Sequence, residues 1–295
     1  MQDRASWLEW RAVEVGGRPV AYGEAGTGPP VVFLHGWGLD HRAYKSALNR
    51  LVSAGMHVVA PALPGCGGSH PIEDERTTID GLADWLAELV ERLDLEPVVV
   101  VGHSFGGALA IAFAHRHRQS VRALVLVNSL GASAWAHRGG VLRSMADRPL
   151  WDWGVHLPAD LWPLRQVRRV LPVVVTEAGG NLLRNPAAFW KMARVARGAD
   201  LTQELSDLRD WGLPVVVLWG ERDRLVTRHT FEETCRLLGD PPSVTVEGSH
   251  AWLIADPDAF GEVMTNVAGV IGLFERKRQR ALGHRHRRPV ERASR

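Results

Sequence analysis

The sequence Gly102-His103-Ser104-Phe105-Gly106 restricts the fold of this chain more than any other segment. An apolar run, residues 97–101, precedes it, and a run of small and apolar residues, 107–114, follows it. A G-x-S-x-G segment held between a strand and a helix predicts a nucleophile elbow, a sharp turn that raises one serine hydroxyl above a sheet. Glycines on both sides of the serine let the strand and the helix pass closely without a Cβ clash. The segment therefore predicts an α/β sheet with a reactive serine at its edge.

An acid that could assist this serine follows a later strand pattern. A serine hydroxyl is a weak nucleophile at neutral pH, so it needs a base, and the base needs an acid that orients it. Residues 213–219 form a buried-strand pattern that leads into Glu221 and Asp223. Sites on open α/β sheets lie just beyond the carboxyl ends of the strands, so both acids are candidates for this position.

The candidate base is His250, one of 13 histidines. The chain order serine, acid, histidine is the one expected for a nucleophile elbow of this type. His250 follows a short strand pattern at 243–246 and lies on the loop before a last predicted helix. Asp256 is expected to cap that helix and Pro257 to be its first residue.

Four motifs, taken in order, resemble those of the α/β-hydrolases that carry an inserted cap. They are His35-Gly36-Trp37-Gly38, Gly102 to Gly107, Gly220-Glu221-Arg222-Asp223 and Gly248-Ser249-His250, and the resemblance covers residues from about 12 to 275. The resemblance implies that Ser104 is the nucleophile and that His250 acts first as general base and then as general acid. It also favours Asp223 over Glu221 as the orienting acid.

Two backbone amides are expected to form the oxyanion hole. Acyl transfer places negative charge on the former carbonyl oxygen, and fixed N–H groups aimed at that oxygen stabilise it. One donor is the amide of Phe105, the residue after the nucleophile, and by resemblance the second is the amide of Trp37. Trp37 and Trp252 each lie one or two residues from the proposed chemistry, so their side chains are the candidates to line an apolar substrate pocket.

Two other histidines and one alanine near these motifs are given no chemical role. His103 is expected to pack or hydrogen-bond beside the elbow, and His35 to order its own loop. Many relatives carry aspartate where this chain has Ala62, a departure that affects the hydrogen bonding expected in the loop of residues 63–69.

The alternation of strand and helix patterns predicts a mostly parallel, eight-stranded α/β-hydrolase sheet with helices on both faces. Residues 1–130 and 210–275 are expected to form the core, with its last helix running from about Asp256 to Arg276. Residues 131–209 are expected to form a helical cap inserted after the sixth strand. Prolines 149, 158, 163, 172 and 186 are expected to break its helices.

The predicted cap is rich in tryptophan, at positions 135, 151, 153, 162 and 190. Tryptophan buries a large rigid surface, so most of these side chains are expected to pack the cap onto the core, and one or two to line the pocket. The segment therefore favours an apolar or aromatic substrate and a site that excludes water.

Charge and cysteine content limit the partners and the compartment. Residues 276–295 hold nine lysines or arginines and one acid, Glu291, and are expected to form a disordered basic tail with at most weak, non-specific binding to nucleic acid or anionic lipid. Cys66 and Cys235 are too few for a disulfide framework or a cysteine metal site. No signal peptide pattern or membrane span is evident, so a cytoplasmic protein is expected.

These observations together predict a serine hydrolase that cleaves an ester or related acyl bond of a small-molecule substrate, with no metal or organic cofactor. The same scaffold allows other reactions, namely carbon–carbon hydrolysis of ring-fission products, acyl transfer and cofactor-free haloperoxidase-like chemistry. A small-molecule receptor built on the fold is a further alternative, because a fold does not fix a function. Dehalogenases and epoxide hydrolases of this fold use an aspartate nucleophile, and Ser104 argues against both.

Overall fold

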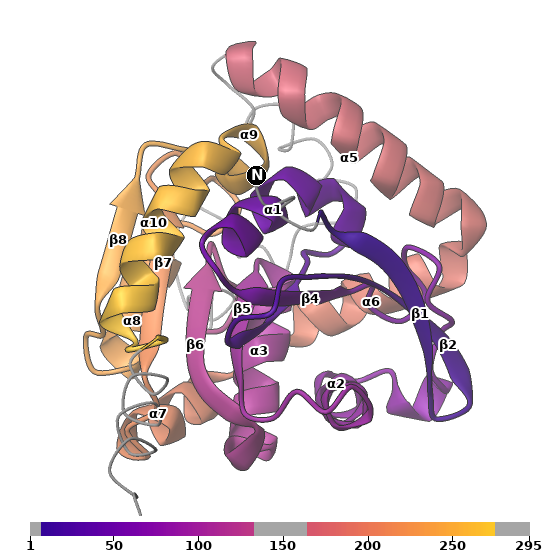
Figure 1. Ribbon diagram of the computed structural model, residues 1–295, viewed down its shortest axis with the longest axis horizontal. Coiled ribbons are helices and arrows are strands. Elements are labelled where there is room, and N and C mark those ends of the chain that lie inside the picture. The colour runs from indigo at the N-terminus through magenta and orange to yellow at the C-terminus, as the bar shows by residue number, and fades with distance from the viewer. Residues whose placement is uncertain (1–6, 133–163, 275–295) are drawn as a thin grey trace, which may run out of the picture.

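The computed structural model describes residues 7–132 and 164–274 of the chain (Figure 1). Its strands form one eight-stranded sheet in the order β1-β2-β4-β3-β5-β6-β7-β8. The strands are β1 Glu9–Val15, β2 Arg18–Ala25, β3 Pro30–Leu34, β4 His57–Pro61, β5 Val98–His103, β6 Val121–Val127, β7 Val215–Gly220 and β8 Ser243–Val246. Strand β2 is antiparallel to β1 and β4, and the other pairs are parallel. The predicted mostly parallel sheet is therefore confirmed.

Helices cover both faces of this sheet, as the alternating pattern predicted. They are α1 Lys45–Ser53, α2 Ile79–Arg92, α3 Phe105–Arg116, α5 Leu164–Arg184, α6 Pro186–Gly198, α7 Thr202–Asp210, α8 Arg228–Leu237, α9 Trp252–Ala255 and α10 Pro257–Val270. Side chains of α2, α3, α7 and α8 pack into one apolar cluster, and those of α1, α9 and α10 pack into a second cluster. The strands between the clusters are apolar on both faces, which is why β5 and β7 are continuous runs of buried residues.

The last helix begins where the sequence predicted and ends earlier. The Asp256 side chain accepts a hydrogen bond from the Ala259 amide, and Pro257 occupies the first turn. The expected end near Arg276 is wrong, because α10 stops at Val270. Gly272 then adopts a φ of +59°, and the amides of Gly272 and Leu273 bond the carbonyls of Gly269 and Ala268. This pattern is a Schellman turn, which glycine favours and which ends a helix.

The described part of the predicted cap consists of α5 and α6, with α7 leading back to the core. Figure 1 shows α5 along the outer edge of the molecule, next to α9. The expected helix break at Pro172 is wrong, since α5 continues across it with the proline on its exposed side. Pro186 instead opens α6 at a first-turn position that suits its missing N–H. Trp135, Trp151, Trp153, Trp162 and the basic tail lie outside the described residues.

Candidate active site

Ser104 occupies the sharp turn between β5 and α3 that the G-x-S-x-G segment predicted. Its φ is +55° and its ψ is −119°, a backbone conformation that residues other than glycine rarely adopt. Main-chain hydrogen bonds hold it there. The Ser104 amide donates to the Val127 carbonyl at 3.0 Å, and the Ser104 carbonyl accepts from the amides of Gly107 at 2.9 Å and Leu130 at 3.1 Å. The strained residue is thus fixed by backbone groups of α3, β6 and the segment after β6.

The elbow glycines are needed for the close approach of strand and helix. A Cβ on Gly102 would lie 2.4 Å from the Gly106 carbonyl oxygen, and a Cβ on Gly106 would lie 2.2 Å from the Leu34 carbonyl oxygen. A Cβ on Gly107 would lie 2.0 Å from Ser129 Oγ. A side chain at Gly102 or Gly106 would clash with the backbone of α3 or β3, as the sequence analysis expected, and one at Gly107 would clash with Ser129.

His250 and Asp223 meet at the carboxyl edge of the sheet, although 27 residues separate them. His250 Nδ1 lies 2.8 Å from Asp223 Oδ2, and the Asp223 side chain is fully buried. The other carboxylate oxygen accepts the amides of Leu225 and Val226, each at 2.8 Å. A carboxylate held in this way fixes both the rotation of the imidazole and the proton on Nδ1, so Nε2 is left with a lone pair.

The alternative acid, Glu221, lies at the exposed start of the same turn. The turn directs the Asp223 carboxylate toward His250, because the Asp223 amide bonds the Gly220 carbonyl at 2.9 Å. The structure therefore pairs His250 with Asp223, the residue that the resemblance favoured.

Asn128 is a residue of this site that the sequence analysis missed. Its Nδ2 donates to Asp223 Oδ2, and its Oδ1 accepts from Trp252 Nε1 at 2.8 Å. Asn128 directly follows β6 and has a φ of +44°, a conformation that asparagine tolerates better than most residues. Its position could have been a sequence signal, because Asn128 follows β6 and Asp223 follows the neighbouring strand β7, and both strands end at the same edge of the sheet.

The loop proposed to supply one oxyanion donor lies against the nucleophile. A Cβ built on Gly36 would be 3.2 Å from Ser104 Cβ. Phe105 is the first residue of α3, where backbone amides have no partner within the helix. The Phe105 amide and the 35–38 loop are therefore close to Ser104, which is what an oxyanion hole requires.

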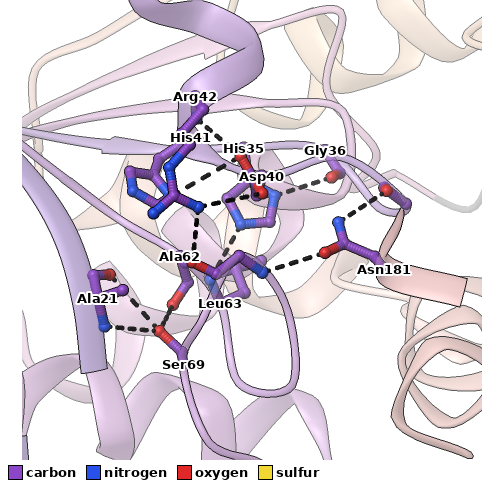
Figure 2. A network of polar contacts seen from close by, with 12 residues as sticks. Ala21, His35, Gly36, Asp40, His41, Arg42, Ala62, Leu63, Ser69 and Asn181 are labelled. Atoms are coloured by element: carbon purple, nitrogen blue, oxygen red, sulfur yellow. Dashed lines mark hydrogen bonds and ion pairs between the residues drawn. The ribbon is translucent and has the colours of Figure 1, made fainter. Parts of the chain in front are cut away.

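His35 and Ser69 hold the loops beneath this site together (Figure 2). The Leu63 amide donates to His35 Nε2 at 2.9 Å, so the proton on Nδ1 points to the Gly36 carbonyl, also at 2.9 Å. Burial lowers the pKa of His35, which keeps the ring neutral. Ser69 Oγ donates to the Ala62 carbonyl at 2.7 Å and accepts from the Ala21 amide at 3.0 Å. His35 orders its loop as predicted, and main-chain partners bond the loop at Ala62 without an aspartate.

The two tryptophans predicted to line the pocket lie in different environments. Trp37 is half-buried, donates from Nε1 to the Phe189 carbonyl at 3.0 Å, and packs against the rings of Phe189 and Trp190 on α6. Trp252 is only 2% exposed, and its N–H is bonded to Asn128. Trp252 thus supports Asn128, which bonds Asp223, and its place in a pocket wall stays a prediction.

Asn181 on α5 joins the predicted cap to two loops of the predicted core. Its Nδ2 donates to the Gly38 carbonyl at 3.2 Å, and its Oδ1 accepts from the Gly67 amide at 3.1 Å. Figure 2 shows this side chain pointing from α5 into the polar network around Asp40. The loop at residues 35–38 is thus bonded to two described helices of the predicted cap, through Gly38 to α5 and through Trp37 to α6.

The same network contains two neighbouring carboxyl groups, Asp40 and Glu177. Asp40 is fully buried, and its Oδ1 accepts from the Arg42 amide at 2.8 Å. Burial and the Asp40 carboxylate raise the pKa of Glu177 to about 7, against weaker opposing effects of Arg42 and Arg184. His41 is buried beside them, and burial lowers its pKa to about 3, so it is neutral and does not balance the two acids.

Within residues 7–132 and 164–274, no group of three or more histidine, cysteine or acidic side chains is placed to hold a metal ion. None of the helices described for the chain is both long and apolar enough to span a bilayer.

Comparison with known proteins places this fold and site in a family. Residues 31–263 match the alpha/beta hydrolase family. A Pseudomonas putida relative, 2-hydroxy-6-oxo-2,4-heptadienoate hydrolase, is 28% identical over 251 residues, which are 81% of this chain and 87% of that protein.

Two solved structures have the same fold at low sequence identity. An esterase from Exiguobacterium antarcticum has a TM-score of 0.73 at 19% identity, with 88% of this chain and 100% of that chain covered. A bromoperoxidase from Bacillus anthracis has a TM-score of 0.72 at 18% identity, with 87% and 98% covered. With a match over most of the chain and an eight-stranded sheet of this topology, the protein is an enzyme of the alpha/beta hydrolase family.

Proposed function

We propose that this protein is a serine hydrolase that cleaves an ester or related acyl bond of a small, apolar or aromatic substrate. Ser104 is the nucleophile, His250 the general base and acid, and Asp223 the orienting acid. The single observation that carries the proposal is the 2.8 Å contact of His250 Nδ1 with the buried Asp223 carboxylate, beside a strained serine elbow. This contact leaves Nε2 of the imidazole able to accept a proton.

The proposed reaction proceeds through an acyl-enzyme. Ser104 Oγ attacks the carbonyl carbon while its proton moves to His250 Nε2, and the Phe105 and Trp37 amides stabilise the oxyanion. The imidazolium then protonates the leaving oxygen as the carbon–oxygen bond breaks. A water molecule next gives a proton to His250 and attacks the acyl carbon. Collapse of the second tetrahedral intermediate releases the acid and returns the proton to Ser104.

Covalent labelling of the serine tests this proposal. A fluorophosphonate probe should attach to Ser104 in the wild-type protein, and mass spectrometry of the digested protein should place the label on that residue. Ser104→Ala should prevent labelling and should lower turnover about a million-fold, because the three residues act as a unit. Ser120→Ala, a serine outside the site, serves as the matched control. A Ser104→Ala variant with most of the wild-type activity would exclude covalent catalysis at this residue.

A second candidate reaction is the hydrolysis of a carbon–carbon bond. The observation that favours it is the similarity to a 2-hydroxy-6-oxo-2,4-heptadienoate hydrolase over 87% of that protein. In that reaction the bond that breaks joins two carbon atoms, and the leaving group is protonated at carbon. The half-buried Trp37, with Phe189 and Trp190 behind it, suits a planar unsaturated substrate.

A substrate panel separates these reactions. We expect turnover of p-nitrophenyl esters, compared across acyl lengths and aromatic acyl groups, to exceed turnover of a ring-fission dienoate. The opposite order would favour carbon–carbon hydrolysis. Ester product formed with added alcohol would indicate acyl transfer, and halogenation with halide and peroxide would indicate haloperoxidase-like chemistry. One equivalent of product followed by no further turnover would favour a receptor.

A further inference from the structure

A continuous line of hydrogen bonds runs through the buried core of the site. The Gly36 amide donates to the Tyr44 hydroxyl oxygen at 3.3 Å. The Tyr44 hydroxyl lies 2.8 Å from His103 Nδ1, and His103 Nε2 lies 2.8 Å from the His250 carbonyl oxygen. The side chains of Tyr44 and His103 are almost completely buried, at 0% and 2% exposure, so water does not compete for these contacts.

The direction of every bond in this line follows from its two ends. A carbonyl oxygen only accepts, so His103 carries its proton on Nε2 and donates to His250. In the neutral ring Nδ1 then accepts, so the Tyr44 hydroxyl donates to it. The Tyr44 oxygen keeps a lone pair for the Gly36 amide, which only donates. Each polar group is satisfied in one arrangement only, which is how a buried polar network specifies a single geometry.

The line joins three segments that the proposed reaction needs in one place. Gly36 precedes Trp37 in the loop proposed to supply an oxyanion donor. His103 directly precedes the nucleophile Ser104, and its ring lies 4.8 Å from that of His250. Strands β3 and β8, which lead into these two loops, are separated by three strands in the sheet, and the described residues show no main-chain hydrogen bond between the two loops.

We infer that His103 and Tyr44 are positioning residues, which hold the oxyanion loop, the serine elbow and the His250 loop in the geometry of the proposed acyl transfer. This inference rests on the proposed function. Neither side chain needs to touch the substrate or exchange a proton with it. Their role is to fix the distance between the base and the oxyanion donors, and small displacements of such groups cost large factors in rate.

The protonation state of His103 is consistent with this role. Burial lowers the pKa of His103 well below its ordinary value, and a positive charge on nearby His250 lowers it further. Burial also raises the pKa of Tyr44, so its hydroxyl keeps its proton. The line therefore stays intact while His250 changes its charge during turnover.

Nitrogen NMR of the wild-type protein tests the line without any activity measurement. In ¹⁵N-labelled protein the His103 ring, assigned from the spectrum of His103→Gln, should be neutral with its proton on Nε2 from about pH 5.5 to 8.5. A proton on Nδ1, or a titration of His103 within this range, would overturn the inference. Because this experiment needs no substrate, its outcome is separate from the labelling of Ser104.

Turnover by variants tests whether the line positions the site. Tyr44→Phe removes the hydroxyl that makes two of the bonds, so kcat should fall about 10-fold with KM within about 2-fold of wild type. Tyr22→Phe removes the other tyrosine hydroxyl of the chain, on β2 and away from this line, and should keep wild-type kcat. A folded Tyr44→Phe variant with wild-type kcat, and with Ser104 labelled at the wild-type rate, would overturn the inference and leave the proposed function intact.

Two replacements of His103 separate positioning from packing. The glutamine in His103→Gln places an amide N–H near the former Nε2, whereas the asparagine in His103→Asn places its polar group near the former Nδ1. Positioning predicts that His103→Gln keeps at least 5-fold more kcat than His103→Asn, an effect about as large as one buried hydrogen bond. Tyr44→Phe should also add little to the loss in His103→Asn, because both changes break the same line. Equal losses for the two His103 variants, or full additivity, would contradict the inference.

Discussion

Main-chain hydrogen bonds hold Ser104 in a strained backbone conformation. A φ of +55° at a residue with a Cβ costs on the order of 1–3 kcal/mol and persists only where the surroundings fix it. Here the surroundings are main-chain groups of β6, α3 and Leu130. Replacing Ser104 with alanine should therefore remove the chemistry without unfolding the elbow.

Asn128 is expected to support the acid of the site. Asn128→Ala removes a donor from the Asp223 carboxylate and leaves the buried Trp252 N–H without its acceptor. We expect kcat to fall about 10-fold and the free energy of unfolding to fall by about 1–3 kcal/mol, because a buried donor loses its partner. Steady-state kinetics and denaturant unfolding measure the two effects.

Trp252→Phe is the matched control for Asn128. It removes the indole N–H that donates to Asn128 and keeps the contact between Asn128 and Asp223. The kcat should therefore change less than in Asn128→Ala. Equal kcat in Asn128→Ala and the wild-type protein would show that Asp223 orients His250 without this amide.

Two glycines on α10 give opposite predictions at the scale of the element. A Cβ on Gly269 meets no atom within 4 Å, so Gly269→Ala should raise the free energy of unfolding by about 0.5–1 kcal/mol, through helix propensity and the stiffer unfolded chain. A Cβ on Gly261 would lie 2.8 Å from Arg50 Cβ on α1, so Gly261→Ala should destabilise the packing of these helices. Urea unfolding of both variants measures the pair, and the same sign for both would contradict this account.

Glu177 should make the docking of α5 sensitive to pH. Its pKa is raised from 4.5 to about 7 in the folded protein. Between about pH 4.5 and 7 the folded state therefore keeps a proton that the unfolded state releases, so the free energy of unfolding falls as pH rises and becomes level above pH 7. Because Glu177 is partly exposed, solvent screening reduces the effect, and we expect a loss of about 1 kcal/mol.

Glu177→Gln should remove this part of the pH dependence and should be more stable than the wild-type protein at pH 8. Hydrogen exchange of the α5 amides and thermal unfolding from pH 4.5 to 8 measure the change. Glu262→Gln, on the exposed side of α10, is the control and should follow the wild-type curve. A Glu177→Gln curve with the wild-type slope would show that the pKa of Glu177 is not raised in the folded protein.

At the scale of the whole molecule, we expect the basic residues 276–295 to be dispensable for turnover. Arg122 on β6 bonds the carbonyls of Gly272 and Leu273, which fastens the end of α10 to the sheet. A chain that ends at Lys277 keeps these contacts, so its kcat and KM should match those of the full chain, while its retention on a heparin column should decrease. A shortened protein that folds but has lost its turnover would show that residues 278–295 take part in the reaction.

The sheet and the elbow could be predicted from the sequence because their signals are local. A valine run of the right length marks a strand buried on both faces, and G-x-S-x-G requires a turn that only glycines allow. The N-cap at Asp256 followed in the same way. The end of α10 was missed because the apolar pattern continues beyond Val270, whereas the backbone conformation of Gly272 stops the helix.

The supporting residues of the site could not be predicted because their partners are distant in sequence. Asn128 follows a strand that looks complete without it, and its two partners lie 95 and 124 residues away. Tyr44 lies in a helical turn 59 residues before His103 and has the sequence surroundings of an ordinary core aromatic. Contacts of this kind depend on the order of strands in the sheet, which sequence periodicity does not specify.

The single amide of Asn181 has a consequence for selectivity. It bonds α5 to Gly38 and Gly67 together, so α5 and the loop proposed to carry an oxyanion donor are expected to move as one unit. A substrate that is bulky enough to displace α5 would also displace Gly38 through Asn181. The proposed oxyanion donor would then be moved away from the substrate carbonyl. Oversized compounds should therefore still bind but should be converted slowly, and the size limit of this enzyme should be found in its rate of conversion rather than in its affinity.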